Sequence, residues 1–212
     1  MALVSELATH GSEFWLFGYG SLIWKPPPHF GKVKHELHLS PSACGFHNPE
    51  DHRGTPEAPG RVVTLIERAY WDQLGDTHHA APERVWGVAY RIKSDRVAEV
   101  KEYLDIREIN GYSVHHQMFQ PADPDAAPIR TLVYIGTPDN EQFTGPQDPR
   151  ELASHIARSK GPSGLNSEYL LELNTALEAL GAGSSDAHIS DLSQRVAKLL
   201  KAEVGQESAI ML

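Results

Sequence analysis

Short apolar runs, separated by glycine, proline and acidic residues, fill the first two thirds of the chain. Residues 14–17 (FWLF), 61–66 (RVVTLI) and 85–92 (VWGVAYRI) have the length and the β-branched and aromatic content of buried strands. Residues 112–119 and 130–136 have the same character, on either side of a loop rich in proline and aspartate. The pattern predicts a strand in each of these runs.

A helical pattern lies between the strand predicted at 85–92 and the one at 112–119. Ser94 is a suitable N-cap, and apolar residues recur at helical spacing from there to Ile106. Asn110 and Gly111 follow as a stop and turn signal. We therefore expect a helix from Ser94 to about Ile106.

The last third of the chain is helical in pattern. Asp148 and Pro149 have the residue types that begin a helix. Asn166 is a candidate cap for a second helix, which Gly181 would stop, and a third helix is expected over residues 186–204. Strands followed by helices predict an α+β domain rather than repeated βαβ units.

The same pattern indicates one domain. We expect it to span residues 14–204, after a flexible lead-in (1–13) and before a short tail (205–212). Within the domain, residues 68–84 and 121–128 have the polar composition of surface loops.

Charge and composition exclude some classes of partner. Lys and Arg number 19 against 28 Asp and Glu, a formal charge of −9, which disfavours a general nucleic-acid binder. No apolar run is long enough to span a membrane, and the first residues lack the pattern of a secretory signal. The single cysteine, Cys44, forms no intrachain disulfide, which fits a reducing compartment. We expect a cytoplasmic protein with no nucleic-acid or membrane partner.

A glycine-rich segment follows the first predicted strand and is the first candidate for chemistry. It consists of Gly18, Tyr19, Gly20, Ser21 and Leu22. A dinucleotide fingerprint would need glycine in place of Ile23, and a nucleophile elbow would need a residue between Gly20 and Ser21. The segment favours a turn whose backbone N–H groups converge on a carboxylate or an oxyanion. A tight turn without function is the alternative.

Glu108 is the second candidate. It follows the C-terminal end of the helix predicted after Ser94, where the helix dipole disfavours a negative charge. Partial burial there would raise its pKa above the reference of about 4.3, toward the range of a general base. A solvated carboxylate is the alternative. Arg53 and Arg61 are candidates either for contact with an anionic ligand or for structural pairing.

The histidines lack the spacing of a metal site. His35 and His38 stand one residue closer than the two histidines of the zincin motif. The neighbours at 78–79 and 115–116 would point apart in a helix or a strand. One cysteine cannot build a cysteine-rich zinc site. We therefore expect no metal.

Several separate segments carry a resemblance to a known family. In order along the chain they are FGYGSLIWKP, DHRGTPEAPGRVVTL, VWGVAYRI, YLDIREINGY, YIGTPDN and GPSGLNSEYL. In sequence and order they resemble the ChaC-type, glutathione-specific γ-glutamylcyclotransferases, over most of residues 14–30 and 50–200. The resemblance implies a small mixed β-barrel with helices packed around it. It also implies cleavage of glutathione to 5-oxoproline and cysteinylglycine, with no metal or cofactor.

The resemblance further implies which residues act. The family's substrate-binding loop falls on Leu16, Phe17, Gly18, Tyr19, Gly20, Ser21 and Leu22. Its catalytic glutamate falls on Glu108, and Tyr112 is a neighbour of the ligand. Glu108 would take a proton from the γ-glutamyl ammonium and later return one to the departing cysteinyl amine. Loop N–H groups would hold the α-carboxylate or the tetrahedral oxyanion.

Residues 31–50 depart from the family pattern. Family members have a strand rich in arginine and aromatic residues here. This chain has no arginine in the segment and places Pro41 and Gly45 where the strand should continue. The segment is interpreted either as a rearranged connection or as a reading-frame or splice-model artefact.

Two alternative functions stay open beside the glutathione-specific enzyme. One is a cyclotransferase for other γ-glutamyl amines, which would share the glutamyl pocket. The other is a catalytically impaired protein that binds glutathione in a regulatory role. The presence of Glu108 favours an enzyme. The sequence pattern defines no oligomeric state.

Overall fold

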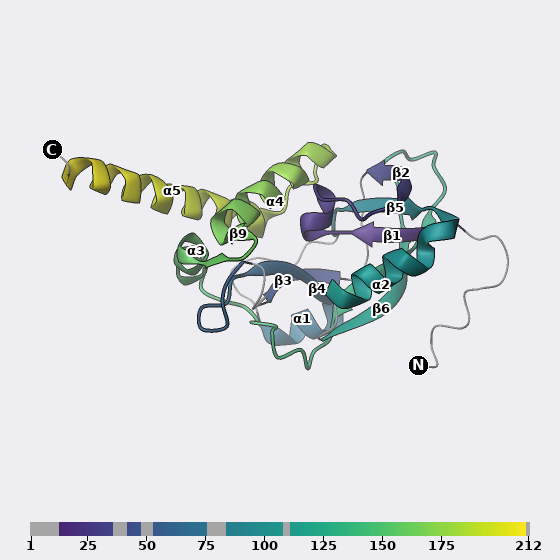
Figure 1. Ribbon diagram of the computed structural model, residues 1–212, viewed down its shortest axis with the longest axis horizontal. Coiled ribbons are helices and arrows are strands. Elements are labelled where there is room, and N and C mark those ends of the chain that lie inside the picture. Colours follow the sequence, from purple (N-terminus) through teal and green to yellow (C-terminus); the bar gives the residue numbers. More distant parts are fainter. Residues whose placement is uncertain (1–12, 36–41, 48–52, 76–83, 108–110, 211–212) are drawn as a thin grey trace.

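A computed structural model of the chain describes residues 13–35, 42–47, 53–75, 84–107 and 111–210 (Figure 1). Its strands are β1 (Phe14–Gly18), β2 (Phe30–His35), β3 (Ser42–His47), β4 (Val62–Glu67), β5 (Val88–Ile92), β6 (Tyr112–Phe119), β7 (Ile129–Gly136), β8 (Lys160–Gly161) and β9 (Gly164–Leu165). Its helices are α1 (Arg68–Leu74), α2 (Val97–Arg107), α3 (Pro149–Arg158), α4 (Asn166–Leu180) and α5 (Ala187–Ile210), with 3-10 turns η2 (Gly20–Ile23) and η3 (Ser94–Arg96). The α+β class is confirmed. None of the described helices combines the length and the apolar character needed to cross a membrane.

The first seven strands form one mixed sheet in the order β2-β5-β1-β7-β4-β3. Strand β6 pairs with β7 in antiparallel register over its whole length, beside this path. Strand β7 also meets β1 and β4 in parallel, so it joins the two halves of the sheet. Among the described strands, β2 and β3 end the path and do not pair with each other. The closed barrel therefore stays a prediction.

Both faces of the central strands are buried. In β1, Leu16 and Phe17 are 0% and 1% exposed, although consecutive strand residues point to opposite faces. One face, which includes Leu16, packs against apolar side chains of α2, α3, α4 and α5. The other face, which includes Phe17, packs against a cluster of strand residues and Val85. Because no described helical residue belongs to this second cluster, the strands cover it with their own side chains.

Local signals located the elements well. Asp148 caps α3 as expected, since its carboxylate accepts the backbone N–H groups of Arg150 and Glu151 at 2.8 and 3.1 Å. Helix α2 begins at Val97, because Ser94 starts a 3-10 turn instead of capping the helix. Helix α5 continues to Ile210, beyond the end expected near residue 204.

Two expectations about irregular segments were wrong. Residues 68–74 form helix α1 where a surface loop was expected. The segment 31–50 contains β2 and β3, although it lacked the family's strand pattern. Strand β3 pairs with β4 through Gly45, opposite Thr64, because glycine keeps the backbone donor and acceptor that the ladder needs. Pro41 lies outside the described residues, just before this strand.

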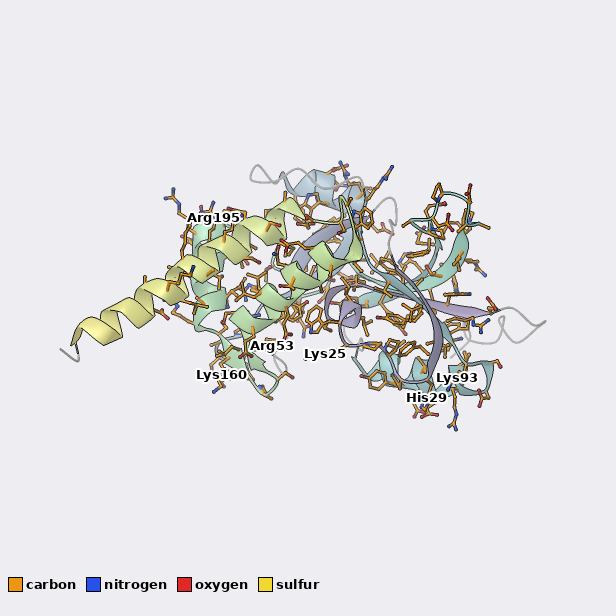
Figure 2. The ribbon with its side chains drawn as sticks, turned by 90° about the horizontal axis from the view of Figure 1, so that it is seen from above. Lys25, His29, Arg53, Lys93, Lys160 and Arg195 are labelled. Carbon is orange, nitrogen blue, oxygen red and sulfur yellow. The ribbon has the colours of Figure 1, made fainter. Side chains whose placement is uncertain are left out.

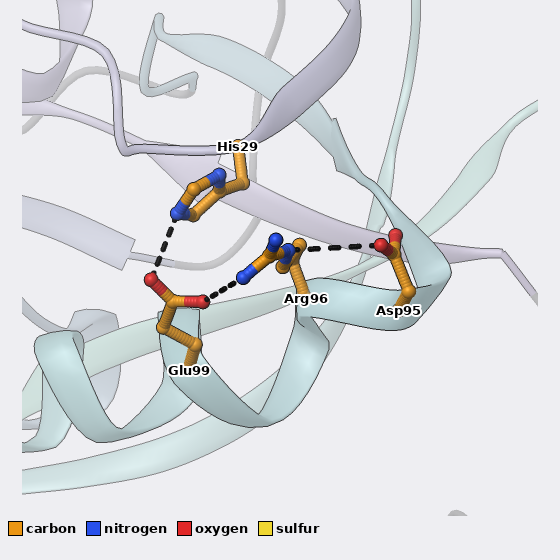
Figure 3. A network of polar contacts seen from close by, with 4 residues as sticks. All are labelled: His29, Asp95, Arg96 and Glu99. Atoms are coloured by element: carbon orange, nitrogen blue, oxygen red, sulfur yellow. Dashed lines mark hydrogen bonds and ion pairs between the residues drawn. The ribbon is translucent and has the colours of Figure 1, made fainter.

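A network of charged side chains fixes the start of α2 (Figure 3). His29 Nε2 lies 2.8 Å from Glu99 Oε1, and Arg96 donates to Glu99 Oε2 at 3.0 Å. Asp95 in turn lies 3.6 Å from Arg96. Hydrogen bonds from Arg96 and His29 lower the pKa of the Glu99 carboxyl. The network ties the turn before β2 to the first turn of α2.

Asn166 does not cap α4, contrary to expectation; Leu165 occupies the cap position. The buried amide of Asn166 instead pairs with the backbone of Arg61. Its Oδ1 accepts the Arg61 N–H at 2.7 Å, and its Nδ2 donates to the Arg61 carbonyl at 2.7 Å. The side chain thus serves as a hydrogen-bonding partner for the chain leading into β4.

We predict that Asn166→Ala lowers the free energy of unfolding by about 3 kcal/mol, because it leaves two buried backbone groups without partners. Urea denaturation would measure the loss. The matched control is Asn174→Ala on the same helix, where the amide bonds the side chains of Glu178 and Ser190. The control should cost about 1 kcal/mol or less. Equal losses in the two variants would contradict the role given to Asn166.

Candidate active site

A cavity of about 500 Å³ contains most of the glycine-rich loop. Of the residues predicted for the site, it is lined by Phe17, Tyr19, Gly20, Ser21, Leu22 and Tyr112. Leu16 is buried in the core behind the loop, and Gly18 packs against Leu22 and Tyr90. Glu108 lies outside the described residues. The remaining wall includes Lys25, Arg53 and Tyr169.

The loop is a tight turn that needs glycine at two positions. Gly20 has a φ of 57°, a left-handed conformation that other residues rarely adopt. A Cβ atom on Gly20 would lie 2.9 Å from Val63 Cγ1 and 3.2 Å from the Tyr169 hydroxyl. A Cβ atom on Gly18 would lie 2.8 Å from the Cβ of Leu22. Packing from β4 and α4 therefore fixes the path of the loop.

Hydrogen bonds within the loop use some of its backbone groups. The N–H of Leu22 donates to the Tyr19 carbonyl at 3.2 Å, and the N–H of Lys25 donates to the Ser21 carbonyl at 2.8 Å. The Tyr90 hydroxyl donates to the Leu22 carbonyl at 2.6 Å. Burial raises the pKa of Tyr90 to about 12. Since the Leu22 amide is used in the turn, fewer loop amides face a ligand than the sequence suggested.

Arg53 supplies a buried positive charge on the cavity wall, near Lys25 (Figure 2). Its Nη1 donates to the Leu165 carbonyl at 2.8 Å and lies 3.7 Å from Glu168 Oε2. Its guanidinium carbon lies 5.8 Å from the centre of the Tyr169 ring, within the range of a cation–π contact. Arg53 is thus structurally paired and also lines the cavity, and its contact with an anionic ligand stays a prediction.

Arg61 pairs with protein groups outside the cavity wall. Its side chain donates to Gln147 Oε1 and to the carbonyls of Pro59 and Gly60, each at 3.0 Å. Burial lowers the pKa of the guanidinium. Arg61 is not part of the cavity wall.

The elements on either side of Glu108 both reach the cavity. Helix α2, which ends at Arg107, contributes Tyr103 and Leu104, and β6 contributes Tyr112. Between them, the Gly111 carbonyl accepts hydrogen bonds from the Thr137 N–H and from Asn140 Nδ2, both at 2.9 Å. The same Asn140 side chain packs closely against Gly111, since a Cβ there would lie 2.2 Å from Asn140 Cγ. Thr137 and Asn140 belong to the segment YIGTPDN, and sequence reasoning gave neither of them a role.

The described part of the chain contains no group of three or more His, Cys, Asp or Glu side chains that could hold a metal ion. The polar groups placed on the cavity wall are instead hydroxyls, cations and backbone. Such a site can hold an anionic substrate and polarise it.

Comparison with known proteins gives the family. The profile of ChaC-like proteins matches residues 14–199. The chain belongs to the ChaC-like family. It is 38% identical to the glutathione-specific gamma-glutamylcyclotransferase of Schizosaccharomyces pombe, over 93% of this chain and 98% of that protein. It is 33% identical to the human glutathione-specific gamma-glutamylcyclotransferase 1, over 93% of this chain and 85% of the human protein.

A solved structure is similar to this ChaC-like protein as well. The crystal structure of a yeast gamma-glutamyl cyclotransferase specific to glutathione superposes with a TM-score of 0.74 at 33% identity. The superposition covers 89% of this chain and 97% of the yeast chain. The family resemblance expected from six sequence segments is thus confirmed.

For this ChaC-like protein we predict that Gly20→Ala is more damaging than Gly145→Ala. Gly145 also has a left-handed φ, 64°, but a Cβ there would meet nothing within 4 Å. Gly145→Ala should therefore lower the free energy of unfolding by about 1 kcal/mol, for the backbone conformation alone. Gly20→Ala should cost about 2 kcal/mol more, because the overlap with Val63 must be relieved. Thermal denaturation would compare the two, and equal shifts would contradict the packing of the loop.

We also predict that stability falls between pH 10 and pH 12 through Tyr90. The unfolded chain ionises this phenol near pH 10, whereas the folded protein keeps the proton to about pH 12, so ionisation favours unfolding in this window. Tyr90→Phe should reduce the slope of unfolding free energy against pH there. The control is Tyr103→Phe, at a side chain that is 42% exposed. An unchanged slope in Tyr90→Phe would refute the burial of this phenol as the cause of the pH dependence.

Proposed function

We propose that the chain is a glutathione-specific γ-glutamylcyclotransferase, which converts glutathione into 5-oxoproline and cysteinylglycine. The observation that carries the proposal is the similarity to proteins of that name over most of both chains. The cavity supports it, because it gathers the glycine loop, Arg53 and Tyr112 in one place.

Glu108 is the proposed general acid and base. It takes a proton from the α-ammonium of the γ-glutamyl group, and the neutral amine then attacks the γ-carbonyl carbon. This new C–N bond closes the five-membered ring, and the C–N bond to the cysteinyl nitrogen breaks. Glu108 returns the proton to that nitrogen, then takes the second proton from the ring nitrogen and passes it to the departing amine, so the step needs no water and no co-reactant. The position of Glu108 between two elements that both line the cavity supports this role.

The cavity wall suits the charge and the shape of this substrate. Glutathione carries two carboxylates, and Arg53 and Lys25 bring positive charge to the wall of an otherwise acidic protein. The backbone of the glycine loop lies close to Leu22, Val63 and Tyr169 because Gly18 and Gly20 lack side chains. Ring closure is intramolecular, so a wall that holds the γ-glutamyl group folded supplies much of the acceleration. We assign substrate contact to Phe17, Tyr19, Gly20, Ser21, Leu22 and Tyr112, and support of the loop to Leu16 and Gly18.

The proposal also covers the closed barrel, the extent of the domain and the cellular location. The cluster of strand residues around Phe17 supports a small barrel in a single domain over residues 14–204. The single cysteine supports a cytoplasmic setting. The reaction itself calls for no cofactor and for no partner beyond glutathione.

We predict that Glu108→Gln lowers the release of 5-oxoproline from glutathione by a factor of about 10² to 10⁴, since the amide cannot accept the ammonium proton. Chromatography of the reaction mixture would measure the product. The matched control is Glu102→Gln, which removes an exposed carboxylate from α2 and should keep full turnover. Circular dichroism of both variants would establish that they are folded. Full turnover by Glu108→Gln would reject the assigned base.

The same assay separates the alternative functions. Faster turnover of γ-glutamyl-alanine than of glutathione would indicate a cyclotransferase for other γ-glutamyl amines. Binding of glutathione by the unaltered protein without any product would indicate an impaired, glutathione-binding relative.

A further inference from the structure

A second cavity, of about 840 Å³, lies beside the first half of α2, with Val97 and Lys101 on its wall. Five basic side chains line it: Arg91 on β5, which is paired with Glu13, and four others, Lys93 after β5, Lys101 on α2, His116 on β6 and Arg130 on β7. Such a concentration of positive charge is notable in a chain whose formal charge is −9. Figure 2 shows Lys93 at the end of the molecule away from Arg53 and Lys160.

The pairing of β6 with β7 brings two of these side chains to one face of the sheet. His116 lies opposite Leu132, and Met118 lies opposite Arg130. Residues directly opposite in an antiparallel pair share a face, as do residues two apart along one strand. His116 and Arg130 are therefore diagonal neighbours on the face of Leu132, which is the face that α2 covers.

Lys101 reaches the same face from α2. Its Nζ lies 5.0 Å from the centre of the Phe14 ring, at the start of β1. Burial, and the positive charges of Arg130, Lys101 and His115, lower the pKa of His116. The cations are thus near enough to act on one another.

The acidic residues on this wall are already engaged. Glu13 accepts hydrogen bonds from Arg91 and from the Trp15 indole, and Asp95 lies 3.6 Å from Arg96. Over the part of the chain that the structure describes, Lys93, Lys101, His116 and Arg130 form no salt bridge. Lys93, Lys101 and Arg130 therefore keep positive charges that no ion pair neutralises, and an anion bound among them lowers their mutual repulsion and favours protonation of His116.

We propose that this basic cavity binds a small, soluble compound that carries phosphate groups. Donors from β6, β7, α2 and the residue after β5 surround a volume far larger than one carboxylate requires. A guanidinium and an ammonium together match the geometry and the multiple charge of phosphate oxygens. The site is separate from the cavity that holds the glycine loop, and none of these four side chains lines that cavity.

The test is isothermal titration of the unaltered protein with inorganic pyrophosphate, at constant ionic strength. We expect saturable binding with one site per chain. Arg130→Gln and Lys101→Gln should each weaken it by about tenfold, the effect of losing one charge-assisted hydrogen bond. The matched control is Lys160→Gln, an exposed cation at the other end of the molecule, which should bind as the unaltered protein does.

Three results would overturn the proposal. They are the absence of saturable binding, equal weakening by Lys160→Gln and Arg130→Gln, and binding to vesicles with phosphorylated lipid headgroups but not to free pyrophosphate. Circular dichroism would establish that each variant is folded. Because the titration requires no turnover, Glu108→Gln should bind pyrophosphate normally, which keeps this test independent of the proposed reaction.

Discussion

The glycine loop keeps its position because α4 is joined to β4 by side chains that bond to the backbone. The Asn166 amide pairs with both backbone groups of Arg61, and the Tyr169 hydroxyl accepts the N–H of Val63 at 3.2 Å. Gly20 occupies the space that Val63 and Tyr169 leave between them. The ring of Tyr169 also makes the cation–π contact with the Arg53 guanidinium. One junction between helix and strand thus sets the backbone of the loop and the direction of the buried cation, two features to which the proposed function assigns substrate binding.

Helix α2 links this cavity to the basic one. Lys101 lines the basic cavity, whereas Tyr103 and Leu104 line the cavity with the glycine loop, about 3 to 4.5 Å further along the helix axis. Strand β6 also contributes to both cavities, through Tyr112 at its start and His116 near its middle. The bridge between His29 and Glu99 fixes the start of α2, and its last residue, Arg107, precedes Glu108. The elements that shape the basic cavity are therefore those that lead to the proposed base.

Features that depend on neighbours in sequence were predictable, and features that depend on distant partners were not. The buried strand at 14–17 and the Asp148 cap follow from residues within one turn or one strand. Asn166 has a capping residue type, but its partner is Arg61, 105 positions away, and only the fold brings the two together. Strand β3 escaped prediction because backbone pairing with β4, rather than its own side-chain pattern, places it in the sheet. Family resemblance indicated the loop and Tyr112 but gave no role to Lys25, which stands in the segment FGYGSLIWKP and lines the same cavity.

The two cavities differ in how rigidly their cationic side chains are fixed. Arg53 is buried and fixed by the Leu165 carbonyl, the Tyr169 ring and the Glu168 carboxylate, so its guanidinium keeps one direction. A fixed cation suits a reaction in which the substrate must be folded into a reactive conformer before a base acts, because no free energy is then spent on ordering the protein. Lys93 and Arg130 are exposed side chains with many rotamers, which an anion must order on binding. A cavity of that kind favours a ligand of high charge held loosely, whereas the cavity with the glycine loop favours a substrate held in one geometry. This difference in order, more than the sign of the charge, supports the proposal that the chemistry takes place in the cavity with the glycine loop.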